Sequence, residues 1–151
     1  MYFDNLKREF QTKNYKMFPM KENDIDDLIL TYGKLPKAYV ELLQLISSGT
    51  TAPFWKGQCF FKCDIPFLNS WAKEILVENR SKAALGINDF VFSMSQGTMF
   101  CFFKLKAEDD PPVYLYTENV PDRFICISTS LTEFIWNYCF DPKIAFSPIA
   151  N

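Results

Sequence analysis

Residues 89–105 read DFVFSMSQGTMFCFFKL, and this stretch decides the fold class. Ser95-Gln96-Gly97 interrupts it with small and polar side chains, which predicts a tight turn between a strand over 89–94 and a strand over 98–105. The second strand has apolar positions on both faces, namely Met99, Cys101, Phe103 and Leu105 on one and Phe100 and Phe102 on the other. A strand of this kind is typical of the centre of a sheet that is covered on both sides.

Further strands are predicted around this hairpin. Short apolar runs at 58–62, 113–116 and 124–127 stand between loops marked by glycine, proline or acidic residues. Strands that follow one another through short connections pair antiparallel. We therefore expect a mainly antiparallel sheet of four to six strands.

Two helices are expected before the strands. Windows 24–32 and 36–46 each carry apolar residues at the i, i+3, i+4, i+7 spacing of an amphipathic helix. Gly33 then offers a left-handed stop to the first helix, and Ser48-Gly49 ends the second. The two windows predict a helical hairpin, whose matching apolar faces must be buried against another element.

Two more helices are expected later in the chain. One covers residues 69–80, and its inward-facing side chains are predicted to be Trp71, Ala72, Ile75 and Leu76. The last helix begins after Ser130, which precedes Glu133 by the three residues of a capping box, where each side chain accepts from the other residue's N–H. We expect this C-terminal helix to pack on the sheet.

The order of the elements predicts an α+β fold. Helices come first, a run of strands follows and a helix closes the chain, without the alternation of a βαβ fold. A length of 151 residues fits one domain. We expect residues 1–21 to form an N-terminal arm or short helix, residues 22–140 the α+β domain, and residues 141–151 a C-terminal tail.

The composition argues against several classes of partner. The net charge is −2 and no basic patch stands out, so no nucleic-acid partner is expected. No apolar run reaches transmembrane length and no signal-peptide pattern opens the chain, so no membrane association is expected. The five cysteines form an odd, irregularly spaced set, which favours reduced thiols and a cytoplasmic location.

The sequence contains no histidine. Its absence removes the Ser-His-Asp and Cys-His nucleophile systems and every histidine-containing metal site. We therefore expect that the protein is not an enzyme and has no catalytic residues. Cys59 and Cys63 could share one face as a zinc pair, but no Cys-x-x-Cys spacing accompanies them, so free cysteines and no metal site are predicted.

The order of short motifs resembles that of the SUKH superfamily over residues 22–140. In chain order the motifs are Leu35-Pro36 with Tyr39 and Leu42-Leu43, Ser48-Gly49 where the family usually has Asn-Gly, Asp89-Phe90-Val91-Phe92, Gln96-Gly97, Asp110-Pro111-Pro112-Val113-Tyr114, and Ile127-Ser128 before Glu133-Phe134-Ile135. Each motif is short, and the specificity lies in their order and spacing.

The resemblance implies an α+β fold with helices flanking a mixed or antiparallel sheet, no catalytic residues and no cofactor. The superfamily contains bacterial immunity proteins, which resemble cytosolic antidotes that bind toxins, often nucleases or deaminases. It also contains fungal regulators of cell-wall glucan synthesis. Our first hypothesis is an immunity protein that binds and occludes a toxin domain. The alternative is a housekeeping scaffold or regulatory interaction domain.

Four residues are candidates for binding a protein partner. Glu108, Asp109 and Asp110 form an acidic loop that suits a basic protein surface, although such a loop also serves simply to keep a sheet edge solvated. Trp55 is a candidate interface anchor because Trp is enriched in binding hot spots. The alternative for Trp55 is that its side chain folds back onto the core.

Overall fold

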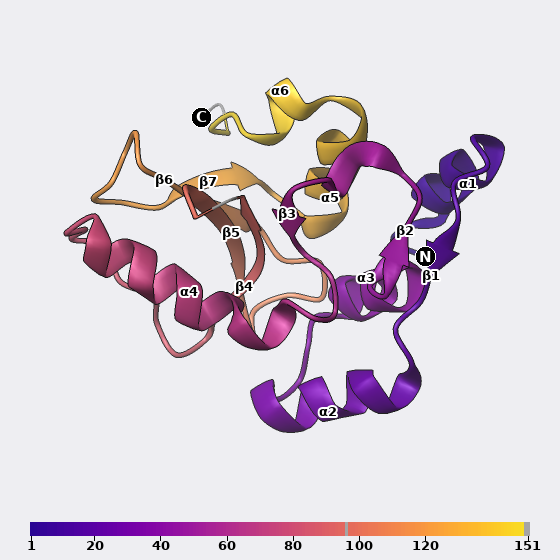
Figure 1. Cartoon of the computed structure of the whole chain (residues 1–151), viewed down its shortest axis with the longest axis horizontal. Coiled ribbons are helices and arrows are strands. Elements are labelled where there is room, and N and C mark those ends of the chain that lie inside the picture. The colour runs from indigo at the N-terminus through magenta and orange to yellow at the C-terminus, as the bar shows by residue number, and fades with distance from the viewer. Residues whose placement is uncertain (96, 150–151) are drawn as a thin grey trace.

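The computed structural model describes residues 1–95 and 97–149. Its elements are α1 (Asp4–Thr12), β1 (Met17–Phe18), α2 (Glu22–Tyr32), α3 (Lys37–Ile46), β2 (Gly49–Thr50), a short 3-10 helix (Pro53–Trp55), β3 (Gln58–Cys59), α4 (Ile65–Glu78), β4 (Asp89–Ser95), β5 (Met99–Lys104), β6 (Val113–Thr117), β7 (Ile125–Ser128), α5 (Leu131–Phe140) and α6 (Pro142–Ala145). Figure 1 shows the strands at the centre with helices on both sides. The predicted α+β class is confirmed.

Five strands form the main sheet in the order β3-β4-β5-β6-β7, and each neighbouring pair is antiparallel. β5 occupies the centre, as its two apolar faces predict. Ser95 pairs with Met99 at the turn between β4 and β5, whereas Gln96 of the predicted turn lies outside the described residues. A register shift between Val91 and Ser93 marks a bulge in β4.

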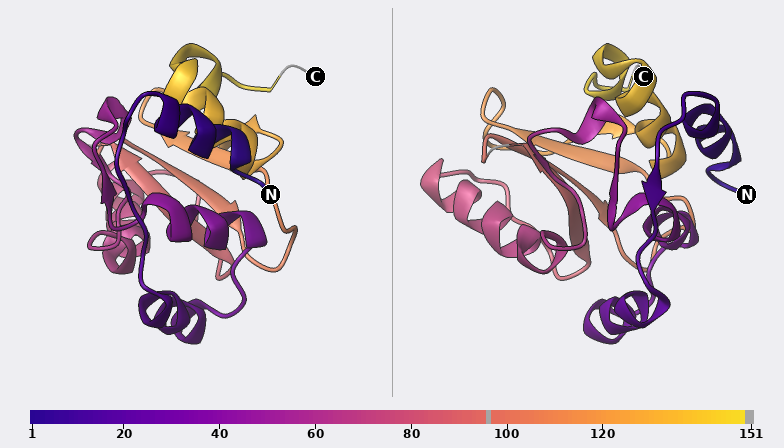
Figure 2. Two further views of the ribbon diagram at one scale, coloured as in Figure 1. Left: turned by 90° about the vertical axis from the view of Figure 1, so that its right-hand side faces the viewer. Right: turned by 45° about the vertical axis from the view of Figure 1, so that its right-hand side comes forward.

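The two faces of the sheet pack against different helices (Figure 2). One face meets α1, α3 and α5 in a core that contains Phe90, Phe92 and Phe103. The other face meets α4 in a core that contains Phe100 and Phe102. The three phenylalanines of β5 are each at most 1% exposed. Both faces of the central strand are therefore covered, and the C-terminal helix packs on the sheet as expected.

The two helices of the predicted hairpin differ in how much they bury. α3 buries five residues, Ala38, Tyr39, Leu42, Leu43 and Ile46. α2 buries Ile25 alone, leaves Leu30 84% exposed and lies away from the sheet (Figure 1). Its apolar stripe has the predicted spacing, but α3 stands between α2 and much of the core, so the stripe is only partly covered.

Two element boundaries differ from the prediction by three residues or more. α4 begins at Ile65, one turn before residue 69, and Pro66 lies in the first turn, where an N–H would have no helical partner. Trp71, predicted to face inward, is only half-buried. β3 ends at Cys59 and not at residue 62, because Lys62 turns away and donates its N–H to the carbonyl of Ser47.

Both ends of the chain pack against the central elements. The N–H groups of Tyr2 and Phe3 donate to the two carboxylate oxygens of Glu41 on α3, at 3.0 and 3.1 Å. At the other end, the N–H of Ile149 donates to the carbonyl of Cys126 in β7 at 3.1 Å. Residues before α2 and after α5 therefore contact the part of the fold that lies between them in sequence.

Candidate protein-binding site

The candidate site is the connection between β5 and β6, residues 105–112, which we call the acidic loop. It lies across the first turns of α3 and α5. Ala38 donates its N–H to the carbonyl of Asp109 at 2.9 Å, and Thr132 donates its N–H to Oδ1 of Asp110 at 3.0 Å. First-turn N–H groups have no partner within their own helix. The acidic loop satisfies one such group on each helix, and both helices hold it in place.

Ser130 completes the start of α5. Its hydroxyl accepts from the N–H of Glu133 at 3.1 Å, which is one half of the predicted capping box. The other half is replaced, because Glu133 Oε2 accepts from the Thr129 hydroxyl and the N–H of Ser130 donates to Ser128. The predicted cap is therefore confirmed for Ser130 and wrong for the side chain of Glu133.

The three carboxylates of the acidic loop differ in exposure. Glu108 and Asp109 are exposed, whereas Asp110 is half-buried. Asp109 Oδ2 lies 3.7 Å from Lys37 Nζ, but both side chains are largely in solvent, where such a pair stabilises little. The loop is thus fixed through the backbone of Asp109 and the side chain of Asp110, while the carboxylates of Glu108 and Asp109 face solvent.

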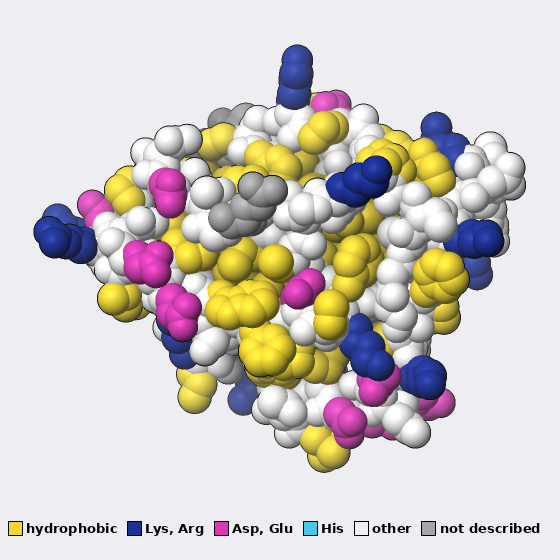
Figure 3. All heavy atoms as spheres, in the orientation of Figure 1, with side chains coloured by type: hydrophobic (Ala, Val, Ile, Leu, Met, Phe, Trp, Pro, Cys, Tyr) yellow, Lys and Arg dark blue, Asp and Glu magenta, His cyan; other side chains and the backbone are white. Residues whose placement is uncertain are grey.

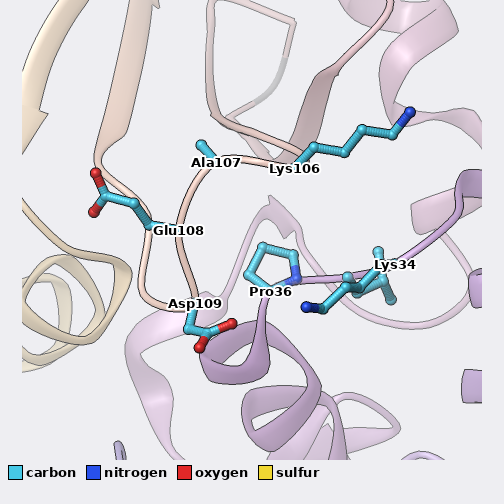
Figure 4. Close-up of a pocket in the computed structure, with 7 residues that line it drawn as sticks. Lys34, Pro36, Lys106, Ala107, Glu108 and Asp109 are labelled. Carbon is cyan, nitrogen blue, oxygen red and sulfur yellow. The ribbon is translucent and has the colours of Figure 1, made fainter.

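A groove with a volume of about 270 Å³ borders the acidic loop on the α3 side. We call it the lysine-lined groove, since Lys34 and Lys106 lie on it together with Glu108 and Asp109. Figure 4 shows Asp109 over the start of α3 beside Pro36, with Glu108 directed away from Lys34. Charges of both signs therefore share this side of the loop.

Trp55 does not join the acidic loop at the surface. Its side chain is 4% exposed and belongs to the core on the α3 and α5 side of the sheet. It stacks on Phe60 with ring centroids 5.1 Å apart and packs beside Tyr138 at 5.4 Å. Trp55 has therefore folded back onto the core, the second of the two alternatives, and in this conformation it presents almost no surface to a partner.

Comparison with known families gives a match over most of the chain. The family model described as SMI1 / KNR4 family (SUKH-1) matches residues 19–137. The chain belongs to the SUKH-1 family. The match includes the acidic loop, α3 and most of α5. Comparison with curated proteins and comparison with solved structures each give no significant match.

The cysteines of this SUKH-1 protein are free thiols in different surroundings. Cys101 and Cys139 are buried, and burial raises the pKa of both thiols. Burial likewise raises the pKa of Cys59, with Asp64 adding to the effect. Within residues 1–95 and 97–149, no three Cys, Asp or Glu side chains gather as metal ligands would. None of the helices in the described part of the chain has the length and apolarity to span a bilayer.

The sequence did not predict a second hollow, on the α5 side of the acidic loop. It has a volume of about 380 Å³, and we call it the acid–indole pocket; the lining residues that define it are Tyr2, Asn5, Asp110, Ser130, Glu133 and Trp136. The three-residue spacing of Glu133 and Trp136 on an amphipathic helix was an available signal, because it places both on one helix face. The wall from residues 2–6 depends on tertiary packing, which no local pattern indicates.

A third surface feature of the SUKH-1 fold is apolar. Figure 3 shows hydrophobic side chains gathered near the middle of the face that carries β3 and the N-terminal half of α4. Phe67 is 51% exposed there and stacks on Trp71, with ring centroids 5.5 Å apart. Exposed aromatic side chains of this kind often mark protein contacts. We call Phe67 and Trp71 the α4 aromatic pair.

Proposed function

We propose that this SUKH-1 protein is a non-catalytic protein-binding module that works in the cytoplasm, and that its partner is a toxin domain of the nuclease or deaminase class which it binds and occludes. The family match over residues 19–137 is the observation that carries the proposal. The family also includes regulator-like domains, so the choice of a toxin as partner is the step that experiment must test.

The acidic loop is the surface that we assign to the partner. Its backbone is held by α3 and α5, so little conformational freedom is lost on binding, and pre-organised surfaces bind more tightly for that reason. Glu108 and Asp109 are neighbours in the sequence, and both side chains are exposed. Enzymes that act on nucleic acids carry basic surfaces, and a local acidic cluster speeds encounter with such a surface. The net charge of −2 is too small to do this alone.

The chemistry of the chain favours binding over catalysis. The sequence has no histidine, the commonest general base near neutral pH. Cysteine nucleophiles need a lowered pKa, whereas burial raises the pKa of Cys59, Cys101 and Cys139. Occlusion of an active site needs no reactive group.

The test is co-expression with the toxic domain encoded beside this chain. We expect growth to be rescued and a stable complex to be isolated by size-exclusion chromatography. The double charge reversal E108K/D109K should weaken the complex by about tenfold or more, because two acids that face a basic surface become repulsive. Asp110 is left unchanged since it caps α5.

The matched control is E74K/E78K on α4, where both acids are exposed and lie on the opposite side of the sheet. It makes the same kind of charge change away from the loop and should leave binding unchanged. If E74K/E78K weakens the complex as much as the loop variant does, the loop is not the interface. If the complex survives both but is lost in F67A, the α4 aromatic pair is the binding surface. No rescue and no complex, with both proteins folded, favours the regulatory scaffold.

A further inference from the structure

The acid–indole pocket combines two kinds of group that recognise cations. Asp110 and Glu133 contribute carboxylates, and Trp136 and Tyr2 contribute aromatic rings. No lysine or arginine lines it, unlike the lysine-lined groove on the other side of Asp109. Among the described residues, no ion pair involves Asp110 or Glu133. The pocket therefore holds negative charge without a resident counter-charge.

Two cations belong to residues beside the lining of the pocket. The N-terminal ammonium of Met1, next to Tyr2, pairs with Asp4. Nη1 of Arg8 on α1 donates to Oδ1 of Asn5 at 3.1 Å, at an exposed position. Asn5 is a lining residue, so Arg8 is bound at the rim. The two carboxylates remain available to a cation that enters from solvent.

The start of α5 does not turn the pocket into an anion site. A free helix N-terminus attracts anions through its unpaired N–H groups. Here the N–H of Thr132 is taken by Asp110 and that of Glu133 by Ser130. An incoming anion would find these donors occupied and would face two carboxylates. Because a carboxylate offers about four acceptor positions, Asp110 keeps capacity for a second donor after capping the helix.

Trp136 supplies a further contact for a cationic group. Trp136 is 37% exposed, packs against Phe140 with ring centroids 4.6 Å apart, and follows Glu133 by three residues on one helix face. An indole ring is the strongest aromatic partner for a cation. Thr132 also lines the pocket, and its buried hydroxyl has no hydrogen-bond partner among the described residues. Buried hydroxyls are usually paired. This oxygen has almost no exposed surface, so a ligand would reach it only after a local rearrangement.

The opposite wall is fixed before any ligand arrives. Glu41 accepts the N–H groups of Tyr2 and Phe3, which ties the start of the chain to α3. The volume of about 380 Å³ leaves room for the end of one long side chain. A small metal ion would need more oxygen ligands than the two carboxylates that line the pocket.

We propose that the acid–indole pocket receives a basic side chain, arginine or lysine, of the protein partner. Its charged end would lie between the carboxylates of Asp110 and Glu133 and over the ring of Trp136. This inference rests on the proposed function and deepens it, since it gives the partner a protruding basic residue that enters a preformed hollow beside the acidic loop.

The experiment uses N-acetylarginine amide as the probe and N-acetylcitrulline amide as its uncharged counterpart of similar shape. Each is titrated into the isotopically labelled full chain and followed by NMR. We expect the arginine probe to give saturable shifts of the Trp136 indole N–H and of the Thr132 and Glu133 amides, with a Kd on the order of millimolar. The citrulline probe should bind at least about fivefold more weakly than the arginine probe, because it lacks the charge.

Variants of similar shape locate the binding. D110N/E133Q removes both charges. The amide that replaces the carboxylate of Asp110 keeps an oxygen acceptor for the cap of α5. The double variant should bind the arginine probe about tenfold more weakly than the wild type. The matched control E108Q/D109N removes two charges from the acidic loop outside the pocket and should leave the affinity within about twofold. E133Q alone, which leaves the contact between Asp110 and Thr132 intact, serves as the second variant if the double variant is unstable.

Four results would contradict the proposal that the acid–indole pocket binds a basic side chain. They are equal binding of the two probes, unchanged affinity in D110N/E133Q or its substitute E133Q, shifts confined to the lysine-lined groove, and no saturable shift at concentrations of about 0.1 M. A complex formed in co-expression without probe binding would refute this pocket and leave the proposed function standing. Probe binding without any protein complex would support the pocket and count against the proposed function.

Discussion

The lysine-lined groove and the acid–indole pocket lie on the two sides of the same acidic loop and are built alike. Each lies at the start of a helix, α3 or α5, and in each case the loop accepts one first-turn N–H. Their charges differ. Lys34 and Lys106 line the groove, whereas no basic residue lines the pocket. Neighbouring acids of one short loop thus have different surroundings, because the fold brings different segments to either side of them.

The helices α3 and α5 also each carry a buried hydroxyl group that lacks a hydrogen-bond partner among the described residues. These are the hydroxyls of Tyr39 on α3 and Thr132 on α5. Tyr39 is 1% exposed and surrounded by the rings of Phe90, Phe92 and Phe103, so no ligand reaches it. Thr132 lines the pocket. The two unpaired hydroxyls therefore differ in their setting, since that of Tyr39 lies among aromatic rings and that of Thr132 belongs to a residue on the wall of the pocket.

The largest effect on stability is expected from a change in the core that supports both the lysine-lined groove and the acid–indole pocket. Phe103 is fully buried and stacks on Phe90 and Phe92, with ring centroids 5.2 and 5.4 Å apart, in the core shared by α3 and α5. Phe103→Ala should lower the free energy of unfolding by about 3–5 kcal/mol. Urea denaturation measures this. Val77→Ala, at a position 78% exposed on α4, is the control and should change it by less than about 0.5 kcal/mol. An F103A variant as stable as the wild type would contradict the packing of β5.

The core on which both hollows rest could be predicted from the sequence. β5 is apolar on both faces, without alternation, which is typical of a central strand covered on both sides, and the spacing in α3 marks one buried face. The prediction was less successful where burial depends on neighbours. The stripe of α2 has the same spacing as that of α3 but is partly exposed, and Trp71 is half-buried although it lies on the predicted inner face.

The candidate site could be predicted only in part. Local composition identified the acids of the acidic loop, but it did not show that Asp110 caps α5 or that Asp109 lies over α3. Both contacts join residues more than 20 positions apart in sequence. Trp55 illustrates the same limit, since a loop position does not reveal whether a ring turns outward or inward. The acid–indole pocket combines residues 2–6 with α5, and only the tertiary structure brings them together.

Removing the unpaired hydroxyl of Tyr39 on α3 should stabilise the protein. Tyr39→Phe deletes a buried hydroxyl without a partner, and such a group costs about 1–3 kcal/mol. We expect the unfolding midpoint in urea to rise by the equivalent of about 1 kcal/mol. The affinity for the arginine probe should stay the same, because Tyr39 is not part of the pocket. A loss of stability in Y39F would mean that the hydroxyl has a partner in solution, such as a buried water.

A change at Ser130 should affect the start of α5, beside the acid–indole pocket, without affecting the start of α3, beside the lysine-lined groove. Ser130→Ala removes the acceptor for the N–H of Glu133 and should destabilise the protein by about 1 kcal/mol, the usual value of a helix cap. Hydrogen exchange of the amides of residues 132–134 should quicken, while that of Ala38 stays slow. Ser130→Asp supplies another good cap and should restore most of the stability. If S130A accelerates exchange equally at both helices, they do not respond independently.

The smallest effect is expected at the ion pair between Lys37 and Asp109. Its atoms are 3.7 Å apart and its side chains are 65% and 47% exposed, so solvent screens the attraction. Lys37→Ala should therefore change the free energy of unfolding by less than about 0.5 kcal/mol. The N–H of Ala38, which donates to the carbonyl of Asp109, is unaffected by this substitution, so the amide shifts of residues 108–110 should remain close to those of the wild type. A double-mutant cycle with D109A isolates the pair. A coupling energy above about 1 kcal/mol, or a large shift of the loop amides in K37A alone, would show that the side chains and not the backbone hold the acidic loop to α3.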